Sequence, residues 1–364
     1  MIRVLQVLGS LIMGGEETFI MNCYRNIDRT KVQFDFLIYE YYKDNHYESE
    51  ALSLGARVFR RPMRKENFIR NLSVLAKILK ENPDIDIVHV HNSNPYAADD
   101  LLIAKMCGVK TRIAHAHGRG SGVRLIKPIL QRLSLLLATD YLSNTPESAV
   151  SLFSETVLKR DRFRIFYNAI DAEKFQYNPQ KRDEIRKQMG LEEKFVVLHV
   201  AQLIKVKNQR FLLEVFANAV KKEPNMVLLI AGVGSEQENL LQYTTELGLN
   251  ESVTFLGLRT DIADLLQVAD LFVFPSISEG LGIAAIEAQA AGLPCLLSTG
   301  VPGECKITDA VEFLPIDEGV ELWVERMLAY KNFKRTDTIE QVKKAGYDIK
   351  SAAKELEDFY VSFS

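Results

Sequence analysis

Short apolar segments alternate with stretches of helical periodicity along the whole 364-residue chain. In the first half, the apolar segments predict strands near residues 2–8, 33–39, 56–59, 86–91, 111–116, 139–143 and 163–166. The same alternation begins again in the second half, with strands near residues 195–201, 226–231, 253–256, 270–274, 294–298 and 311–314. Such alternation favours parallel sheets covered by helices. The sequence therefore predicts an α/β protein built from two doubly wound, Rossmann-like halves.

The chain is too long for one typical hydrophobic core, so two domains are expected. A polar, turn-rich stretch from Asn168 to Asp183 is the predicted linker. We expect a first domain over residues 1–173 and a second over residues 174–347. Residues 348–364 have apolar positions at helical spacing and predict a separate C-terminal helix.

Polar and glycine-rich clusters follow the predicted strands. A doubly wound sheet binds its ligands at the carboxyl ends of its strands. The clusters of the first half are Gly14 to Glu17, His91 with Asn92, His117, and Asn144 with Thr145. Those of the second half are Gln202 to Lys207, Gly232 with Gly234, Gly257 to Arg259, and Glu279 to Glu287. We expect the two sets of strand ends to line a cleft between the domains.

The most informative of these clusters lies between Pro275 and Pro294. Gly280 and Gly282 separate a predicted strand from an alanine-rich helix. Glycines at a helix start let free backbone N–H groups approach an anion such as a diphosphate. Glu287, one turn further in, can accept hydrogen bonds from the vicinal hydroxyls of a ribose. This predicts a nucleotide-sugar pocket. A tight connection that only allows close packing would explain single residues, but not the whole segment.

Gly14 and Gly15 permit two interpretations. They could form a turn before an acidic helix start, or their amides could reach a bound diphosphate. The GxGxxG pattern is absent between Gly9 and Glu17, which argues against a dinucleotide-dependent oxidoreductase.

Four histidines form two pairs with i, i+2 spacing: His89, His91, His115 and His117. Residues two apart in a strand share a face, so a metal site and a buried, hydrogen-bonded cluster both fit this spacing. No carboxylate ligand accompanies either pair, and we expect no metal. We expect His117 to contact the substrate. Asp84-Ile-Asp86 spells a metal-binding DxD motif, but it precedes its strand and so lies at the wrong end of the sheet.

Charge and cysteine content narrow the class of protein. The net charge of −3 argues against nucleic acid as a partner. The four cysteines lack metal-ligand spacing and fit a reduced, cytoplasmic protein. The N-terminus lacks a signal-peptide pattern, and no run is long enough to cross a membrane. Basic and apolar residues mix in segments 60–65 and 119–132, where Leu125, Ile126, Ile129 and Leu130 are apolar. Peripheral contact with the inner face of the cell membrane and a helix docked on its own sheet fit these segments equally well.

Together these features resemble the retaining glycosyltransferases of family 4, which have the two-domain GT-B fold. The resemblance covers the whole chain, and its most specific part is the segment from Glu279 to Glu287. The segments 87–91, 168–171, 207–208 and 14–17 follow the order of the family's motifs. The segments 287–294 and 345–349 are most similar to the bacterial exopolysaccharide and capsule enzymes.

The resemblance implies a role for each matching residue. His117, Glu279 and Lys207 would be catalytic: His117 beside the donor sugar, Glu279 on the sugar hydroxyls and Lys207 on the diphosphate. Gly15 would donate a backbone amide to the diphosphate, and Glu287 would hold the ribose. The remaining donor-site residues would be Gln202, Leu258, Arg259, Gly280, Leu281 and Gly282. The C-terminal helix would cross back to the first domain.

The implied activity is transfer of a sugar from a nucleotide sugar, with UDP as the expected nucleotide, to a polysaccharide or lipid-linked oligosaccharide. The resemblance implies a front-face mechanism with retention, without metal or other cofactor. One residue departs from the family, because Gln202 stands where an arginine is usual; Lys205 or Arg210 would have to compensate. An alternative function is therefore a nucleotide-sugar-binding partner subunit with little activity of its own. An epimerase or hydrolase would need a second acid–base pair, which the sequence does not offer.

Overall fold

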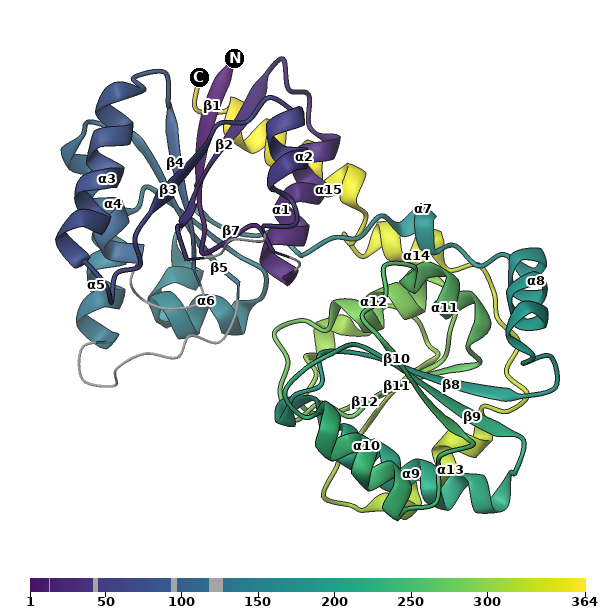
Figure 1. Ribbon diagram of the computed structural model, residues 1–364. Coiled ribbons are helices and arrows are strands. Elements are labelled where there is room, and N and C mark those ends of the chain that lie inside the picture. The colour runs from purple at the N-terminus through teal and green to yellow at the C-terminus, as the bar shows by residue number, and fades with distance from the viewer. Residues whose placement is uncertain (13, 42–44, 93–96, 118–126) are drawn as a thin grey trace. The chain divides into compact units, whose positions relative to one another are not determined.

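The computed structural model describes residues 1–12, 14–41, 45–92, 97–117 and 127–364 (Figure 1). The chain divides into two compact units. The first unit contains Met1–Ala169 together with Ile349–Ser364, and the second contains Ile170–Asp348. The chain thus leaves the first unit once and returns to it for its last helix.

The described residues of the first unit form a seven-stranded sheet in the order β3-β2-β1-β4-β5-β6-β7, with parallel pairing throughout. Its strands are β1 (Ile2–Val7), β2 (Val32–Tyr39), β3 (Val58–Arg61), β4 (Ile87–Asn92), β5 (Thr111–Ala116), β6 (Asp140–Ser143) and β7 (Phe163–Ile165). Its helices are α1 (Gly15–Asn26), α2 (Glu48–Ser53), α3 (Phe68–Glu81), α4 (Ala97–Met106), α5 (Lys127–Leu137), α6 (Pro146–Phe153) and α15 (Ile349–Val361), with a 3₁₀ turn over Glu155–Lys159.

The second unit has a six-stranded parallel sheet within the described residues, in the order β10-β9-β8-β11-β12-β13. Its strands are β8 (Phe195–Val200), β9 (Met226–Ala231), β10 (Val253–Gly257), β11 (Leu271–Phe274), β12 (Cys295–Ser298) and β13 (Val311–Leu314). Its helices are α7 (Ala172–Phe175), α8 (Pro179–Met189), α9 (Gln209–Lys222), α10 (Gln237–Glu246), α11 (Ile262–Val268), α12 (Ile283–Ala290), α13 (Val320–Ala329) and α14 (Ile339–Lys344), with 3₁₀ turns over Lys205–Lys207 and Gly303–Cys305.

All of the predicted strands are present, and the prediction of two doubly wound α/β halves is confirmed. Strand β3 is shifted by two residues from its predicted position, since it spans Val58–Arg61 and was expected near residues 56–59. The strand extends past the expected end to Arg61, which is buried and pairs with Asp100 at 2.5 and 3.0 Å. A paired arginine is compatible with a buried strand position.

The predicted linker between 168 and 183 is also more ordered than expected. It contains α7 and the beginning of α8. Helix α8 starts here because Pro179 occupies its first turn and the side chain of Asn178 accepts a hydrogen bond from the Lys181 N–H at 3.0 Å. Such caps satisfy N–H groups that have no partner inside the helix.

The two faces of the first sheet have different coverings. Val88 and Val90 of β4 lie in one apolar core, with residues of α3, α4 and α6. Ile87 lies in the other core, with residues of α1 and α15. Helix α15 contacts α1 and buries Leu356, Phe359 and Tyr360. The last helix of the chain is therefore part of the hydrophobic core of the first unit.

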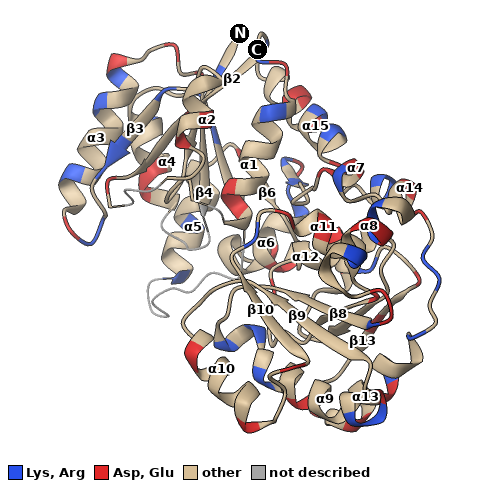
Figure 2. Cartoon of the chain, turned by 45° about the vertical axis from the view of Figure 1, so that its right-hand side comes forward, with Lys and Arg blue, Asp and Glu red and all other residues tan. Residues whose placement is uncertain are grey.

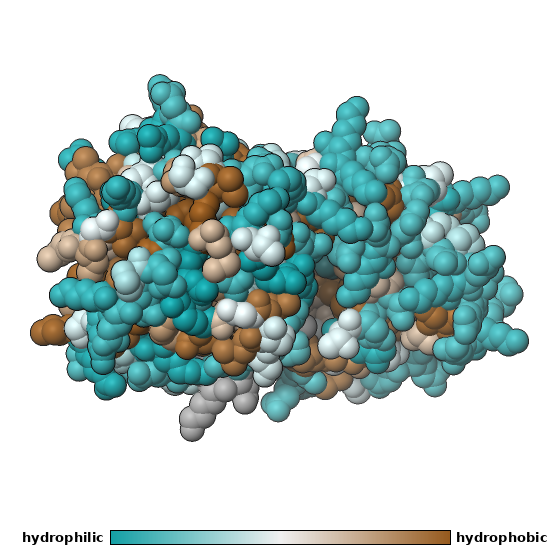
Figure 3. All heavy atoms as spheres, turned by 90° about the horizontal axis from the view of Figure 1, so that it is seen from above, coloured by the Kyte–Doolittle hydropathy of each residue, from teal (hydrophilic) through white to brown (hydrophobic). Residues whose placement is uncertain are grey.

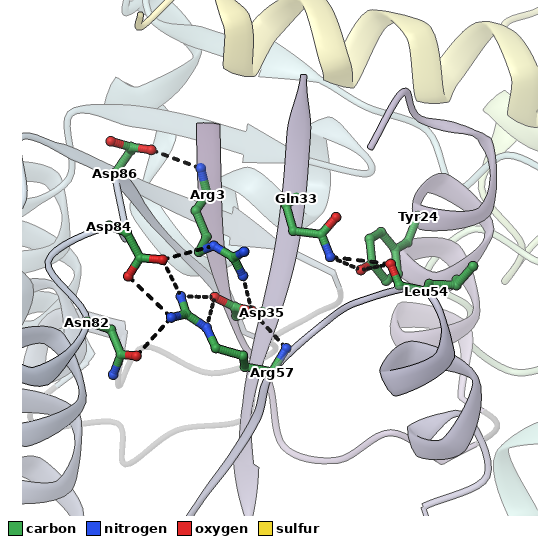
Figure 4. Close-up of polar contacts among 9 residues, drawn as sticks. All are labelled: Arg3, Tyr24, Gln33, Asp35, Leu54, Arg57, Asn82, Asp84 and Asp86. Atoms are coloured by element: carbon green, nitrogen blue, oxygen red, sulfur yellow. Dashed lines mark hydrogen bonds and ion pairs between the residues drawn. The ribbon is translucent and has the colours of Figure 1, made fainter. Parts of the chain in front are cut away.

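A network of ion pairs lies toward the amino-terminal ends of the strands of the same sheet, as Figure 4 shows. Asp35 of β2 has no exposed surface and pairs with Arg3 at 2.8 Å and with Arg57 at 2.6 Å. Asp84 contacts both arginines at 3.1 Å. Asp86 accepts a hydrogen bond from the backbone N–H of Arg3 at 2.9 Å. The DxD-like segment thus lies before β4 and stabilises the fold, as its position in the sequence predicted.

Candidate active site

The site predicted in the second unit is built around the loop between β11 and α12. Helix α12 begins directly after Gly282, whose φ of +84° is unfavourable for other residues. A Cβ atom at Gly282 would lie 3.2 Å from the side chain of Val301. The loop is also held from both sides. The Glu279 N–H donates to the carbonyl of Gly300 at 3.1 Å, and the Ile277 N–H donates to the carbonyl of Val206 at 2.8 Å.

Lys207 and Glu279 are in direct contact. The Lys207 Nζ lies 2.5 Å from Glu279 Oε1. The two side chains are only 18% and 8% exposed, respectively. Nζ also lies 5.4 Å from the ring centroid of Phe274, a cation–π distance. The structure therefore brings two of the three predicted catalytic residues together at one strand edge.

The loop that carries Gln202 is positioned by contacts between backbones. A Cβ at Gly232 would lie 1.9 Å from the carbonyl oxygen of Ala201, and one at Gly234 would lie 2.3 Å from that of Leu203. Neither position can hold a larger residue without moving this loop. The carbonyl of Gln202 accepts a hydrogen bond from Gln209 Nε2 at 2.8 Å, while the Gln202 side chain is exposed. The glutamine amide is thus free to turn toward a ligand.

Two cations were expected to compensate for the missing arginine. Arg210 stacks on Tyr243 at 3.6 Å from the ring centroid and pairs with Glu214 at 3.7 Å. Lys205 is exposed, and no ion pair of its ammonium group is found among the residues described. Of the two, Lys205 is the residue whose charge is available to an anionic ligand.

Glu287 lies in the second turn of α12, as predicted. Burial raises the pKa of its carboxyl group to about 7, and the charge of Lys174 in α7 opposes this rise. In the described part of the chain, no hydrogen bond or ion pair of the Glu287 side chain is found, while its backbone carbonyl accepts from the Ala291 N–H at 3.1 Å. A poorly solvated carboxylate without a partner is an acceptor available to the hydroxyls of a ligand.

The remaining donor-site candidates divide by exposure. Leu258 follows β10 and is 66% exposed, and Arg259 pairs with Asp261, with Nε at 2.8 Å from Oδ1. Leu281 is 3% exposed, so its side chain packs inside the protein and only its backbone can face a ligand. Gly15 is the first residue of α1. Its N–H therefore has no acceptor within the helix.

The predicted histidine cluster exists and lies on the α1 and α15 side of the first sheet. The parallel register pairs His91 of β4 with His115 of β5, and His89 and His117 continue the same face. The rings of His89 and His91 are 4.0 Å apart between centroids, as are those of His115 and His117. Burial lowers the pKa of all four histidines, that of His117 to about 3. These imidazoles are neutral at physiological pH.

A metal ion fits this cluster poorly. The nitrogens of His89, His91 and His115 lie within 4.8 Å of one another. However, His89 and His115 are stacked with an interplanar angle of 11°, so their in-plane lone pairs run side by side and do not converge on one point. Both nitrogens of His91 already take part in hydrogen bonds. The arrangement favours a hydrogen-bonded chain over a tetrahedral metal site.

For the basic segment 60–65, the sequence left membrane contact and packing within the fold equally open, and in the structure most of its charge is used internally. Arg60 pairs with Glu48 at 2.5 Å, Arg61 with Asp100, and Arg64 with Asp100 at 2.9 Å. Of the second predicted segment, residues 119–126, including Leu125 and Ile126, lie outside the described residues.

Sequence reasoning missed several residues that position the site. Gln6 and Tyr360 contact the histidines, although 354 positions separate them in the sequence. His199 Nδ1 donates to the carbonyl of Val273 at 2.9 Å, and its Nε2 lies 3.2 Å from Gln209 Nε2. No local motif marks these residues. Only the strand register and the return of α15 bring them to their partners.

The site residues fall into two groups, one in each unit. Gly15 and His117 belong to the first unit, and Phe19 of α1 lies 6.4 Å from His117 between ring centroids. The other predicted donor-site residues belong to the second unit. Each group lies at the carboxyl ends of the parallel strands of its own sheet.

Comparison with known proteins gives matches to both halves of the chain. A family model described as Glycosyltransferase Family 4 matches residues 13–174, and one described as Glycosyl transferases group 1 matches residues 181–335. The chain is 33% identical over 361 residues to the putative glycosyltransferase EpsF of Bacillus subtilis, covering 95% of this chain and 93% of that protein. It is 28% identical over 249 residues to a UDP-Gal:alpha-D-GlcNAc-diphosphoundecaprenol alpha-1,3-galactosyltransferase of Escherichia coli, covering 66% and 64%.

Solved structures share the fold. A glycosyltransferase from Rickettsia africae superposes with a TM-score of 0.80 at 14% identity, covering 100% of this chain and 98% of that chain. Anabaena Alr3699/HepE in complex with UDP gives a TM-score of 0.75 at 20% identity, covering 100% and 97%. On the strength of its sequence relatives, its family-model matches and this two-sheet architecture, the chain belongs to glycosyltransferase family 4 and is a glycosyltransferase with the GT-B fold.

Proposed function

We propose that the chain transfers a sugar from a UDP-sugar to a growing polysaccharide or lipid-linked oligosaccharide, with retention at the anomeric carbon and without a metal ion. The observation that carries this proposal is the buried contact between Lys207 and Glu279 beside the glycine-opened start of α12. A cation suited to a diphosphate thus contacts a carboxylate suited to sugar hydroxyls, and this carboxylate stands just before a helix start whose first N–H groups have no acceptor within the helix.

The nucleotide is proposed from relatives. The name of the Escherichia coli relative gives a UDP-sugar as its donor, and the Anabaena structures contain UDP, UDP with glucose, or UDP-glucose. Another relative, from Corynebacterium glutamicum, is named as GDP-mannose-dependent. The base is therefore the part of the donor that must be tested directly.

In the proposed reaction, Glu279 accepts hydrogen bonds from the donor sugar and Lys207 neutralises the charge that grows on the departing diphosphate. The bond between the anomeric carbon and the diphosphate oxygen breaks as the acceptor oxygen bonds to the same face. The leaving phosphate oxygen takes the acceptor proton. Binding of the donor must therefore draw Lys207 partly away from Glu279.

A double-displacement route would need a nucleophilic carboxylate at the strand ends of the first unit, and two carboxyl groups, Glu16 and Glu17, follow β1. Burial, with a smaller contribution from the charge of Glu17, raises the pKa of Glu16 to about 8, so this group is mostly protonated at neutral pH and is a poor nucleophile. Glu17 is the other candidate. Its Oε1 accepts a hydrogen bond from Ser10 Oγ at 2.8 Å, and its Oε2 lies 2.3 Å from the position of a Cβ on Gly14. This carboxylate is folded back over its own helix start, which suits a structural role.

The proposed acceptors explain a need for membrane contact. The name of a Campylobacter jejuni relative, like that of the Escherichia coli enzyme, contains a diphospho-undecaprenol acceptor. No helix in the described ranges combines the length and apolar character that a membrane crossing requires.

Helices α4 and α5 offer a surface for this contact. They pack against each other and expose apolar side chains beside Lys105, Lys127 and Arg132. These apolar side chains are Leu102, Met106, Ile129, Leu133 and Leu136, exposed by 44, 75, 60, 40 and 71%. Figure 2 shows basic residues on α5, and in the view of Figure 3 brown, hydrophobic side chains cover more of the first unit than of the second. We propose that this surface binds anionic lipid.

Pelleting with vesicles tests the surface. Wild type should sediment with vesicles that contain anionic lipid at low salt, and Leu136→Ser with Ile129→Ser should reduce the bound fraction several-fold. The control is Leu241→Ser on α10, which is 44% exposed in the second unit. Equal binding by all three proteins would remove the surface from the proposal.

Nucleotide release by the purified chain tests the activity. UDP-, GDP- and ADP-sugars are compared in the presence of EDTA, with Glu279→Gln as the site variant and Glu238→Gln, on the exposed face of α10, as the control. Release from one UDP-sugar that is lost only in Glu279→Gln supports the donor, the residue and the absence of metal together. Restoration by Mg²⁺ or Mn²⁺ would contradict the metal-free route.

The alternative function, a nucleotide-sugar-binding partner subunit, is based on Gln202. This exposed glutamine stands where the family usually has an arginine that would contact the diphosphate. A chain that binds UDP but releases no sugar from any donor would be a nucleotide-sugar-binding partner subunit. Gln202→Arg then separates the two functions. A large gain in turnover would show that the missing cation limits an active enzyme.

A further inference from the structure

The four histidines of the first unit are linked to its last helix by hydrogen bonds. Tyr360 Oη lies 2.6 Å from His89 Nδ1 and 3.2 Å from Gln6 Nε2. Gln6 Oε1 lies 2.7 Å from His91 Nε2, and His91 Nδ1 lies 2.8 Å from His117 Nε2. The result is a continuous chain from α15, through β1 and β4, to the residue that follows β5.

Elementary hydrogen-bond rules give this chain a direction. The Gln6 carbonyl oxygen can only accept, so His91 Nε2 must carry the hydrogen that joins them. A neutral imidazole has one N–H, so His91 Nδ1 is an acceptor. His117 Nε2 must then donate to it. The nitrogen that remains, His117 Nδ1, carries a lone pair.

The other end of the chain obeys the same rules. Gln6 Nε2 donates to Tyr360 Oη. The Tyr360 hydroxyl then donates its own hydrogen to His89 Nδ1, which leaves the hydrogen of His89 on Nε2. Gln6, Tyr360, His89 and His91 are all at least nine-tenths buried, so water does not compete for these bonds.

We propose that Gln6 and His91 are positioning residues that hold His117 in its Nε2–H tautomer, so that Nδ1 accepts a hydrogen bond from a hydroxyl of the donor sugar. This inference rests on the proposed function and on the expected contact of His117 with the donor sugar. His117 Nδ1 is buried and has no hydrogen-bond partner among the residues described. A buried acceptor without a partner is destabilising until a ligand donates to it.

The orientation of one amide decides the tautomer. Turning the Gln6 side-chain amide by half a turn would place its NH₂ group against His91. Every bond of the chain would then reverse, and His117 would present an N–H at Nδ1 instead of a lone pair. A group that must accept a bond from the sugar would become a donor. The tautomer of His117 therefore shows in which direction all the hydrogen bonds between Tyr360 and His117 point.

Nitrogen chemical shifts measure this tautomer without any assay of activity. Wild-type protein with ¹⁵N-labelled histidine is examined by long-range ¹H–¹⁵N correlation, and His117→Gln identifies the signals of His117. We expect a protonated Nε2 and an unprotonated Nδ1 at neutral pH. The reverse pattern would overturn the proposal in the wild type alone, whether or not any other variant folds.

Gln6→Leu tests the origin of the tautomer. Removing the acceptor frees His91, and His117 should become a mixture of tautomers; Gln6→Glu, which restores an acceptor toward His91, should recover Nε2–H. The matched control is Gln33→Leu, a buried glutamine of the adjacent strand that bonds Tyr24 and not the histidines. An unchanged His117 in Gln6→Leu would overturn the role of Gln6.

Turnover distinguishes this inference from the function on which it rests. Gln6→Leu should lower the rate of sugar transfer about tenfold, while Gln33→Leu stays within about twofold. A shifted tautomer with undiminished transfer would contradict the contact between His117 and the donor. If wild-type protein transferred sugar from none of the nucleotide sugars but His117 had the predicted tautomer, the proposed function would be wrong. The assignment of the hydrogen bonds would still stand.

Discussion

Buried polar residues at the two ends of the strands of the first sheet differ in whether they have partners. At the amino-terminal edge, the buried carboxylate of Asp35 is matched by Arg3 and Arg57. At the carboxyl-terminal edge, neutral histidines are stacked, and several of their buried nitrogens have no partner within the described structure: His89 Nε2, both nitrogens of His115, and His117 Nδ1. Paired charges stabilise the fold, whereas unpartnered acceptors and donors leave positions for a ligand.

The largest expected effect concerns the amino-terminal edge. Asp35→Asn leaves Arg3 and Arg57 without their buried counter-charge and should lower the free energy of unfolding by about 3–5 kcal/mol. Asp86→Asn, at the exposed end of the same network, should cost less than about 1 kcal/mol. Urea denaturation measures both. Similar losses in the two variants would contradict the distinction between buried and exposed members of the network.

The next largest effect concerns Lys207, which contacts Glu279 in the second unit. Lys207→Met should reduce transfer about 100-fold, because a cation that neutralises the leaving group is worth roughly 3 kcal/mol in a poorly solvated site. Lys331→Met removes a lysine–glutamate pair at the surface of the same unit and should leave the rate unchanged. Steady-state kinetics under saturating donor decides. A rate loss of equal size in both variants would indicate a general loss of folded protein.

Glu287 should make donor binding depend on pH. Its pKa is raised from 4.5 to about 7, so the carboxyl is mostly protonated at pH 6 and mostly ionised at pH 8. The ionised form accepts hydrogen bonds from both ribose hydroxyls, so UDP should bind about tenfold more tightly at pH 8 than at pH 6. Calorimetry measures the affinity. Glu287→Gln should bind with little pH dependence, and a wild type equally insensitive to pH would contradict the assignment.

The smallest effect compares two buried histidines. Neither nitrogen of His115 has a partner in the part of the chain that is described, whereas His199 uses both of its nitrogens. His115→Met should therefore stabilise the protein by about 1 kcal/mol, and His199→Met should destabilise it by about 1–3 kcal/mol. Thermal unfolding measures the two shifts. A destabilised His115→Met would mean that the nitrogens of His115 are satisfied after all.

The sequence predicted the strands well because buried parallel strands are short apolar runs bounded by glycine or polar residues. It predicted the strand, the loop and the helix around Glu279, Gly282 and Glu287 because these three elements follow one another in a single segment. Their order depends only on local sequence, so residue spacing is enough to place them. The same holds for the exclusion of the segment from Asp84 to Asp86, which depends only on the direction of β4.

Contacts between distant segments were not predictable in this way. The sequence could not decide whether the arginines of segment 60–65 contact lipid or pack within the fold, because their partners Glu48 and Asp100 lie in other segments. Gln6 and Tyr360 carry no motif, and their relation to His91 follows from sheet register and helix packing. The linker was misjudged because Asn178 and Pro179 begin a helix whose composition is polar.

Helix α15 has a consequence for the order in which the protein is made. Residues 170–348 form an uninterrupted unit, whereas the core of residues 1–169 is completed by Leu356, Phe359 and Tyr360. A ribosome releases these side chains only after it has made residues 170–348. The first unit to be translated is therefore the last to reach its native packing, and in the meantime the α1 face of its sheet must be kept from aggregating.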